Sequence, residues 1–121
     1  MKSYSLSFGT ITIINKKLAE VIINDGVIID EIMVDEYHDF LLSALQPPFS
    51  LIINKKHSYC LNFNAQRTIL SLKEIKDIAV VIGSVGALMS TETLININSD
   101  KNWNIDLFHS RDEALDWLAK Q

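Results

Sequence analysis

Two apolar runs in the second half of the chain limit its fold more than any other feature. Residues 49–54 and 78–82 are dominated by Ile, Leu, Val, Phe and Ala. Such runs are typical of strands covered on both faces, as in parallel sheets. We interpret residues 103–108 as a third strand of this kind, and segments of helical character separate the three. Because helices connect parallel strands by right-handed crossovers, this half of the chain predicts a parallel sheet flanked by helices.

The first quarter of the chain has the opposite pattern. Residues 4–8 and 10–13 alternate between polar and apolar side chains, which is typical of half-buried strands. Residues 18–23 are interpreted as a third strand, and the Asn-Asp-Gly at residues 24–26 is a turn sequence. Gly9 is expected to mark a bulge or bend rather than a full turn. These strands predict an antiparallel meander at one edge, so residues 1–121 are expected to form a single α/β domain with a mixed sheet.

Helical patterns occupy the gaps between the strands. Over residues 30–45, apolar residues recur at three- and four-residue spacing, acidic residues occupy the other face, and a Pro-Pro pair follows. A short helix is expected over residues 62–69, and another begins just after Gly83 and Ser84. The C-terminal part of that later helix is ambiguous, because residues 94–98 also alternate as a strand does.

Two serines stand at the spacing of a capping box. Ser71 precedes Glu74 by three residues, and Ser110 precedes Glu113 by three residues. In a capping box the hydroxyl and the acidic side chain satisfy the free N–H groups of the first helical turn. Both serines are therefore expected to open helices. The helix after the second has an apolar face made of Ala114, Leu115 and Leu118.

Charge and cysteine content exclude several classes of protein. With 11 basic and 15 acidic residues the net charge is -4, which argues against a nucleic-acid binder and favours a basic surface on a protein partner. Cys60 is the only cysteine, so no internal disulfide can form. A reduced, cytoplasmic setting is expected, with Cys60 as a small buried hydrophobe. The longest apolar stretch, residues 78–89, is too short for membrane insertion.

Motifs that carry catalysis or cofactors are missing from the sequence. It contains no GxGxxG, no GxxxxGK[ST], no HExxH and no GxSxG. Neither a cofactor nor a metal is therefore expected, and the chain is not expected to be an enzyme. His38 lies in the acidic helix, where we expect it to be exposed to solvent.

Four residues remain as candidates for binding a partner or ligand. His57 and Ser58 follow the first apolar strand, Ser84 follows the second, and His109 follows the third. Open α/β sheets bind ligands at the carboxyl ends of their strands, so the four are expected to share one rim. Two plainer interpretations stay open. Ser84 can be interpreted as a helix cap in a compact turn, and His57 and Ser58 as part of a solvated loop.

The end of the chain resembles a known signature. Residues 108–118 are similar to the closing pattern of SpoIIAA-like proteins, F-x-(three or four residues)-EAxxWL. These proteins belong to the broad STAS/SEC14-like group, and residues 78–89 are similar to the strand and helix before that pattern. The matching residues are Phe108, Glu113, Ala114, Trp117 and Leu118. The resemblance implies a mixed sheet flanked by helices. It also implies a cytoplasmic, bacterial, non-enzymatic module with a regulatory or protein-interaction role.

Members of this group bind their partners in different ways. Anti-sigma-factor antagonists change partners through a phosphorylatable serine in a DSSG-like loop. The corresponding residues 56–64 contain Ser58 but not that motif, so the resemblance does not imply the phosphorylation switch. SEC14-type relatives bind lipid, which makes a small apolar ligand or lipid the alternative to a protein partner. Because 121 residues leave little volume for a pocket, such a ligand would sit in a groove or at a homodimer interface.

Overall fold

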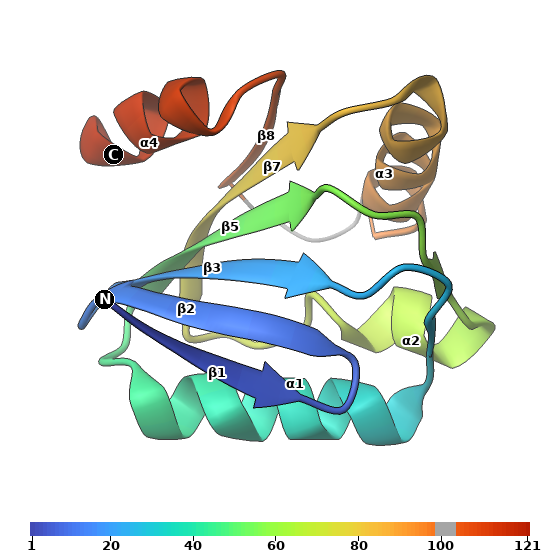
Figure 1. Ribbon diagram of the computed structural model, residues 1–121, viewed down its shortest axis with the longest axis horizontal. Helices are drawn as coiled ribbons and strands as arrows, with labels where there is room; N and C mark the ends of the chain where they lie inside the picture. The colour runs from blue at the N-terminus through green and yellow to red at the C-terminus, as the bar shows by residue number, and fades with distance from the viewer. Residues whose placement is uncertain (99–103) are drawn as a thin grey trace.

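The computed structural model describes residues 1–98 and 104–121, in which six strands form one sheet in the order β1-β2-β3-β5-β7-β8 (Figure 1). These strands are β1 (Lys2–Leu6), β2 (Gly9–Asn15), β3 (Leu18–Ile23), β5 (Phe49–Lys55), β7 (Ile75–Ile82) and β8 (Asn104–Phe108). Two short strands, β4 (Ile28–Ile29) and β6 (Cys60–Leu61), form a second sheet. The helices in this part of the chain are α1 (Glu31–Ala44), α2 (Phe63–Thr68), α3 (Val85–Ile97) and α4 (Arg111–Ala119).

The main sheet is antiparallel over its first three strands and parallel over the rest. β1 pairs with β2, and β2 with β3, in antiparallel register. The pairs β3–β5, β5–β7 and β7–β8 are parallel. The predicted α/β class with a mixed sheet is therefore confirmed. Because β5, β7 and β8 run the same way, their carboxyl ends lie at one edge of the sheet, where the chain leaves for β6, α3 and α4 (Figure 1).

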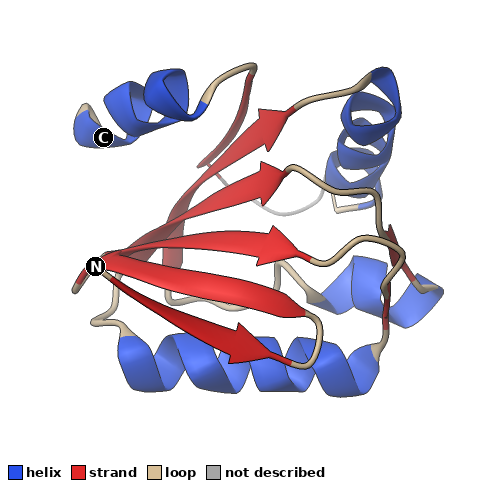
Figure 2. Ribbon diagram, in the orientation of Figure 1, coloured by secondary structure: helices blue, strands red, loops and turns tan. Residues whose placement is uncertain are grey.

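Helices cover both faces of the sheet, as the alternation of side chains along β7 shows. Ile78 and Val80 pack with apolar residues of α3. Ala79 and Val81 point the other way and pack in a cluster with Ala114 of α4. α1 and α2 lie on the α3 side, so three helices cover one face and α4 covers part of the other (Figure 2).

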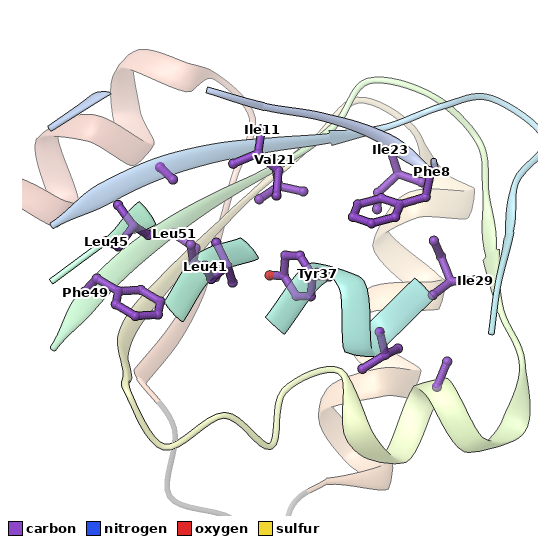
Figure 3. Close-up of a cluster of buried hydrophobic side chains, with 13 residues drawn as sticks. Phe8, Ile11, Val21, Ile23, Ile29, Tyr37, Leu41, Leu45, Phe49 and Leu51 are labelled. Atoms are coloured by element: carbon purple, nitrogen blue, oxygen red, sulfur yellow. The ribbon is translucent and has the colours of Figure 1, made fainter. Parts of the chain in front are cut away.

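The largest buried cluster joins α1 to β2, β3 and β5. Asp30 sets where α1 begins, because its carboxylate accepts a hydrogen bond of 2.9 Å from the N–H of Met33. The helix then presents Leu41 to the sheet, where the side chain is fully buried. The close-up in Figure 3 shows the cluster around it, including Phe8, Ile11, Val21, Tyr37, Phe49 and Leu51.

Gly9 follows a full turn, so the expected bulge or bend is wrong. Residues 7–8 form the turn, and Leu6 pairs with Gly9 across the β1–β2 hairpin. A Cβ atom at Gly9 would overlap the backbone carbonyl oxygen of Ile22 on β3. Glycine therefore allows the close approach of two backbones at this position.

The capping-box spacing of Ser71 and Glu74 does not open a helix. Residues 71–74 are a loop, and β7 begins at Ile75. The Ser71 hydroxyl donates a 2.7 Å hydrogen bond to the carbonyl oxygen of Thr68, at the end of α2. Because α2 ends at Thr68 and β7 begins at Ile75 and pairs at once with β5, the six residues between them leave no room for another helix.

The third predicted strand, residues 103–108, is not buried on both faces. Trp103 lies outside the described residues, and β8 is the last strand of the sheet, with Asn104 and Asp106 exposed. These polar residues alternate with half-buried Ile105 and Leu107, which is the pattern of a strand covered on one face. The ambiguity over residues 94–98 is also resolved, since α3 continues to Ile97.

Ser110 caps α4 as predicted. Its Oγ accepts a 3.2 Å hydrogen bond from the N–H of Glu113 and donates to the Glu113 carboxylate at 3.2 Å. Replacing Ser110 with Ala should therefore lower the free energy of unfolding by about 1 kcal/mol. Ser5→Ala on exposed β1 is the control, with an expected change below about 0.5 kcal/mol. Urea unfolding compares the two variants, and equal stabilities would contradict the capping role.

Candidate functional site

The four predicted site residues line one cleft. His57, Ser58, Ser84 and His109 border a depression of about 870 Å³ at the carboxyl ends of β5, β7 and β8. This volume lies within the range of about 300–1,000 Å³ that ligand sites occupy. The prediction that these residues share one rim therefore agrees with their positions. The other lining residues are Asn54, Lys55, Lys56, Tyr59, Cys60, Val81, Ile82, Gly83, Gly86, Ala87 and Ser90.

One wall of the cleft is the loop from β5 to β6. Its residues His57 and Ser58 are exposed. The Ser58 N–H donates a 3.1 Å hydrogen bond to the Asp25 carboxylate, and the Ser58 carbonyl accepts one of 2.8 Å from the N–H of Gly26. Gly26 has φ +78°, a left-handed conformation that glycine adopts without strain. The loop is therefore fixed to the turn that precedes β4.

The opposite wall is the start of α3. Ser84 is the N-cap, and its Oγ accepts a 3.1 Å hydrogen bond from the N–H of Ala87. Ser84 thus has the capping role that the sequence left open, and it also lines the cleft. A Cβ atom at Gly83 would meet nothing within 4 Å. The backbone there is accessible from the cleft.

His109 closes the cleft on the α4 side, beside a polar cluster beneath the rim. Arg111 Nε donates to Glu20 Oε1 at 2.8 Å, and Asn54 Nδ2 donates to Glu20 Oε2 at 3.0 Å. Asn54 itself lines the cleft. This cluster ties β3 and β5 to the start of α4, two residues after His109.

Lys55 is the side chain that the sequence analysis missed. Its Nζ lies 3.3 Å from the Oγ of Ser90 on α3 and 5.1 Å from the ring centre of Tyr59. Burial lowers the pKa of this lysine below its usual value. The position at the end of a buried strand was visible in the sequence, but the burial of its ammonium group depends on α3, which comes thirty residues later.

A small apolar cavity lies under the cleft, between the sheet and the helices. Its volume is about 50 Å³, and Lys55 and Tyr59 line both this cavity and the cleft. Burial raises the pKa of the Tyr37 and Tyr59 hydroxyls above the usual range. The electrostatic effect of Tyr59 raises the pKa of Tyr37 further, by a smaller amount. Both phenols are therefore neutral at pH 7. Apart from Thr91, the remaining wall is apolar and includes Val34. It also includes Phe8 and Ile29, which are labelled in Figure 3.

Two residues near this region differ from their predicted environments. Cys60 is exposed rather than buried, because it lies on two-residue β6 at the cleft. His38 is half-buried rather than exposed, since its Nε2 donates a 2.9 Å hydrogen bond to the carbonyl oxygen of Ile69. The environment of His38 thus depends on Ile69, which lies 31 residues later in the chain.

A metal-binding cluster and a membrane-spanning helix are both absent from residues 1–98 and 104–121. His, Cys, Asp and Glu side chains in these ranges do not gather in a group of three able to hold a metal ion. Within the same residues, each helix is too short or too polar to cross a membrane.

Comparison with known proteins assigns neither a family nor a function to the chain. The sequence matches no protein-family model, and no curated protein and no solved structure shows significant similarity to the chain. The resemblance to SpoIIAA-like proteins therefore stays a prediction.

Proposed function

We propose that this protein is a cytoplasmic, non-enzymatic interaction module that docks a protein partner at the cleft between the β5–β6 loop and α3. The observation that carries the proposal is the gathering of all four predicted site residues around one concave surface. Loops at the carboxyl ends of parallel strands are where α/β folds place their binding residues. A regulatory role of the kind implied by the SpoIIAA-like resemblance is consistent with such a surface.

Exposed apolar side chains border the cleft on two sides and support a protein partner. On α3, Val85 and Met89 are 72% and 64% exposed, next to the lining residues Gly86 and Ser90. On the other side Ile28, which is 64% exposed, pairs with Cys60 of the cleft wall. Exposed apolar groups around a polar centre are typical of surfaces that bind other proteins.

Neither competing function has comparable support. Among the hydrogen bonds of the described residues, none pairs His57 or His109 with a serine or cysteine, as nucleophilic catalysis would need. For an apolar ligand or lipid, the apolar cavity under the cleft has a volume of about 50 Å³, which is too small for an acyl chain. A protein partner requires no such volume.

Site-specific photocrosslinking tests this proposal. A photoreactive amino acid at His57 should crosslink one predominant polypeptide in a lysate of the source organism, identified by mass spectrometry. The same group at Asp116, exposed on α4, is the control and should give no such product. Equal labelling from both positions, or none from His57, would overturn the proposal. A product with twice the mass of the chain would also overturn it, because the occupant would then be a second copy.

A further inference from the structure

We propose that the cleft recognises a single anionic group, a carboxylate or a phosphate, held by Lys55 near the N-terminal end of α3. This inference rests on the proposed function, because the group would belong to the docked partner. The proposed function states that a partner docks at the cleft, and this inference names the chemical group of the partner that the cleft binds. Three properties of the cleft support it: its local charge, the environment of Lys55 and the accessible backbone at the start of α3.

The charge of the cleft is opposite to the charge of the chain. The protein carries 15 acidic and 11 basic residues, yet among the described residues those that line the cleft include Lys55, Lys56, His57 and His109 and no aspartate or glutamate. The local charge therefore favours an acidic group on the partner, whereas the net charge alone had predicted a basic one. A cleft that collects one sign of charge attracts the opposite sign.

The nearby carboxylates are engaged outside the cleft. Asp25 accepts the N–H of Ser58 and does not line the cleft. Glu20 lies beneath Asn54, where Arg111 neutralises it at 2.8 Å. In the described part of the chain the salt bridges join Lys76 to Asp77 and Arg111 to Glu20. The cleft lysines thus have no acidic partner in this region of the protein.

Lys55 is the cation that most needs a counter-charge. Its side chain is partly buried, and its ammonium group contacts the neutral hydroxyl of Ser90 and the face of the Tyr59 ring. Neither supplies a negative charge, so removal from water disfavours the ammonium form. An anion beside Nζ would compensate for this desolvation and make a charge-assisted hydrogen bond.

The start of α3 offers backbone donors on the same side. Ser84 satisfies the N–H of Ala87, whereas Val85 and Gly86 occupy first-turn positions whose N–H groups lack partners within a helix. Gly83 and Gly86 carry no side chain that would shield this backbone, and Gly86 lines the cleft. The N-terminal end of this 13-residue helix also has a partial positive charge. This partial charge adds to the positive electrostatic potential of the Lys55 ammonium group.

Titration of the intact protein with small anions tests the site. Proton–nitrogen NMR spectra are recorded with sodium phosphate or sodium acetate, with chloride keeping the ionic strength constant. The amides of Gly83, Gly86 and His57 should shift and saturate. Lys55→Met, which keeps the aliphatic stem, should weaken binding at least about tenfold, as expected for a lost charge-assisted hydrogen bond. Lys73→Met, in the exposed loop before β7, is the matched control and should bind like the wild type.

Each outcome of the titration is decisive. Saturation by phosphate alone assigns a phosphorylated group, saturation by acetate alone assigns a carboxylate, and saturation by both supports a shared anion site. No saturable shift, or equal affinity in Lys55→Met, overturns the inference. If Lys55→Met does not fold, Lys56→Gln replaces it, with a weaker but measurable loss of affinity expected and unchanged affinity counting against the site. Crosslinking from His57 without anion binding would leave the proposed function intact and refute only this inference.

Discussion

Replacing Leu41 with Ala is expected to lower the free energy of unfolding by about 3–4 kcal/mol, the largest effect predicted for this protein. Leu41 is 0% exposed and lies in the cluster that joins α1 to the sheet (Figure 3). Truncation removes buried methyl groups and leaves a cavity that the surrounding strands fill only in part. Because α1 is the longest helix of the described residues and covers three strands, the loss should appear in the unfolding of the whole domain.

Leu42→Ala supplies the matched control for this prediction. The two substitutions share the same chemistry and the same change in helix propensity, but Leu42 is 42% exposed. Its loss should stay below about 1 kcal/mol, because much of its side chain already contacts water. Urea denaturation followed by circular dichroism measures both variants. Equal losses at the two positions would mean that α1 presents a different face to the sheet.

The elements that the sequence predicted correctly depend on local signals. α1 has an apolar face at helical spacing, and its cap and its end are set by Asp30 and the Pro-Pro pair. α4 likewise begins at the predicted Ser110 cap. The same local rule failed at Ser71, because spacing alone does not show that the next four residues must reach a strand pairing with β5. A capping pattern predicts a helix only where the fold leaves length for one.

The candidate site was predictable in position but not in chemistry. His57, Ser84 and His109 could be placed on one rim, since each follows a strand of the predicted parallel sheet. The role of Lys55 could not be found in this way. It requires α3 to pack beside β5 and bring Ser90 to the ammonium group. Contacts between residues far apart in sequence set burial and local charge, so the net charge of the chain does not give the charge of the residues that line the cleft.

The second large effect concerns the ion pair beneath the rim. Arg111→Met should lower the free energy of unfolding by about 2 kcal/mol, because it leaves the carboxylate of Glu20, whose side chain is 9% exposed, with only the Asn54 amide as a partner. The Arg111 side chain is 41% exposed, so solvent screening keeps the loss below the 3–5 kcal/mol typical of fully buried pairs. Lys76→Met is the control, since its bridge to Asp77 is long, at 3.8 Å, and involves a half-exposed lysine. That change should cost less than about 0.5 kcal/mol.

A double variant separates the cost of an unpaired charge from the value of the pair. Glu20→Gln combined with Arg111→Met should be more stable than Arg111→Met alone by about 1 kcal/mol, because a neutral amide at residue 20 needs no counter-charge and still accepts from Asn54. Urea unfolding of the wild type, both single variants and the double variant completes the cycle. If the losses of stability in the single variants simply add, the side chains of Glu20 and Arg111 are not energetically coupled. The ion pair would then not be what fixes α4 and His109 to the rim of the cleft.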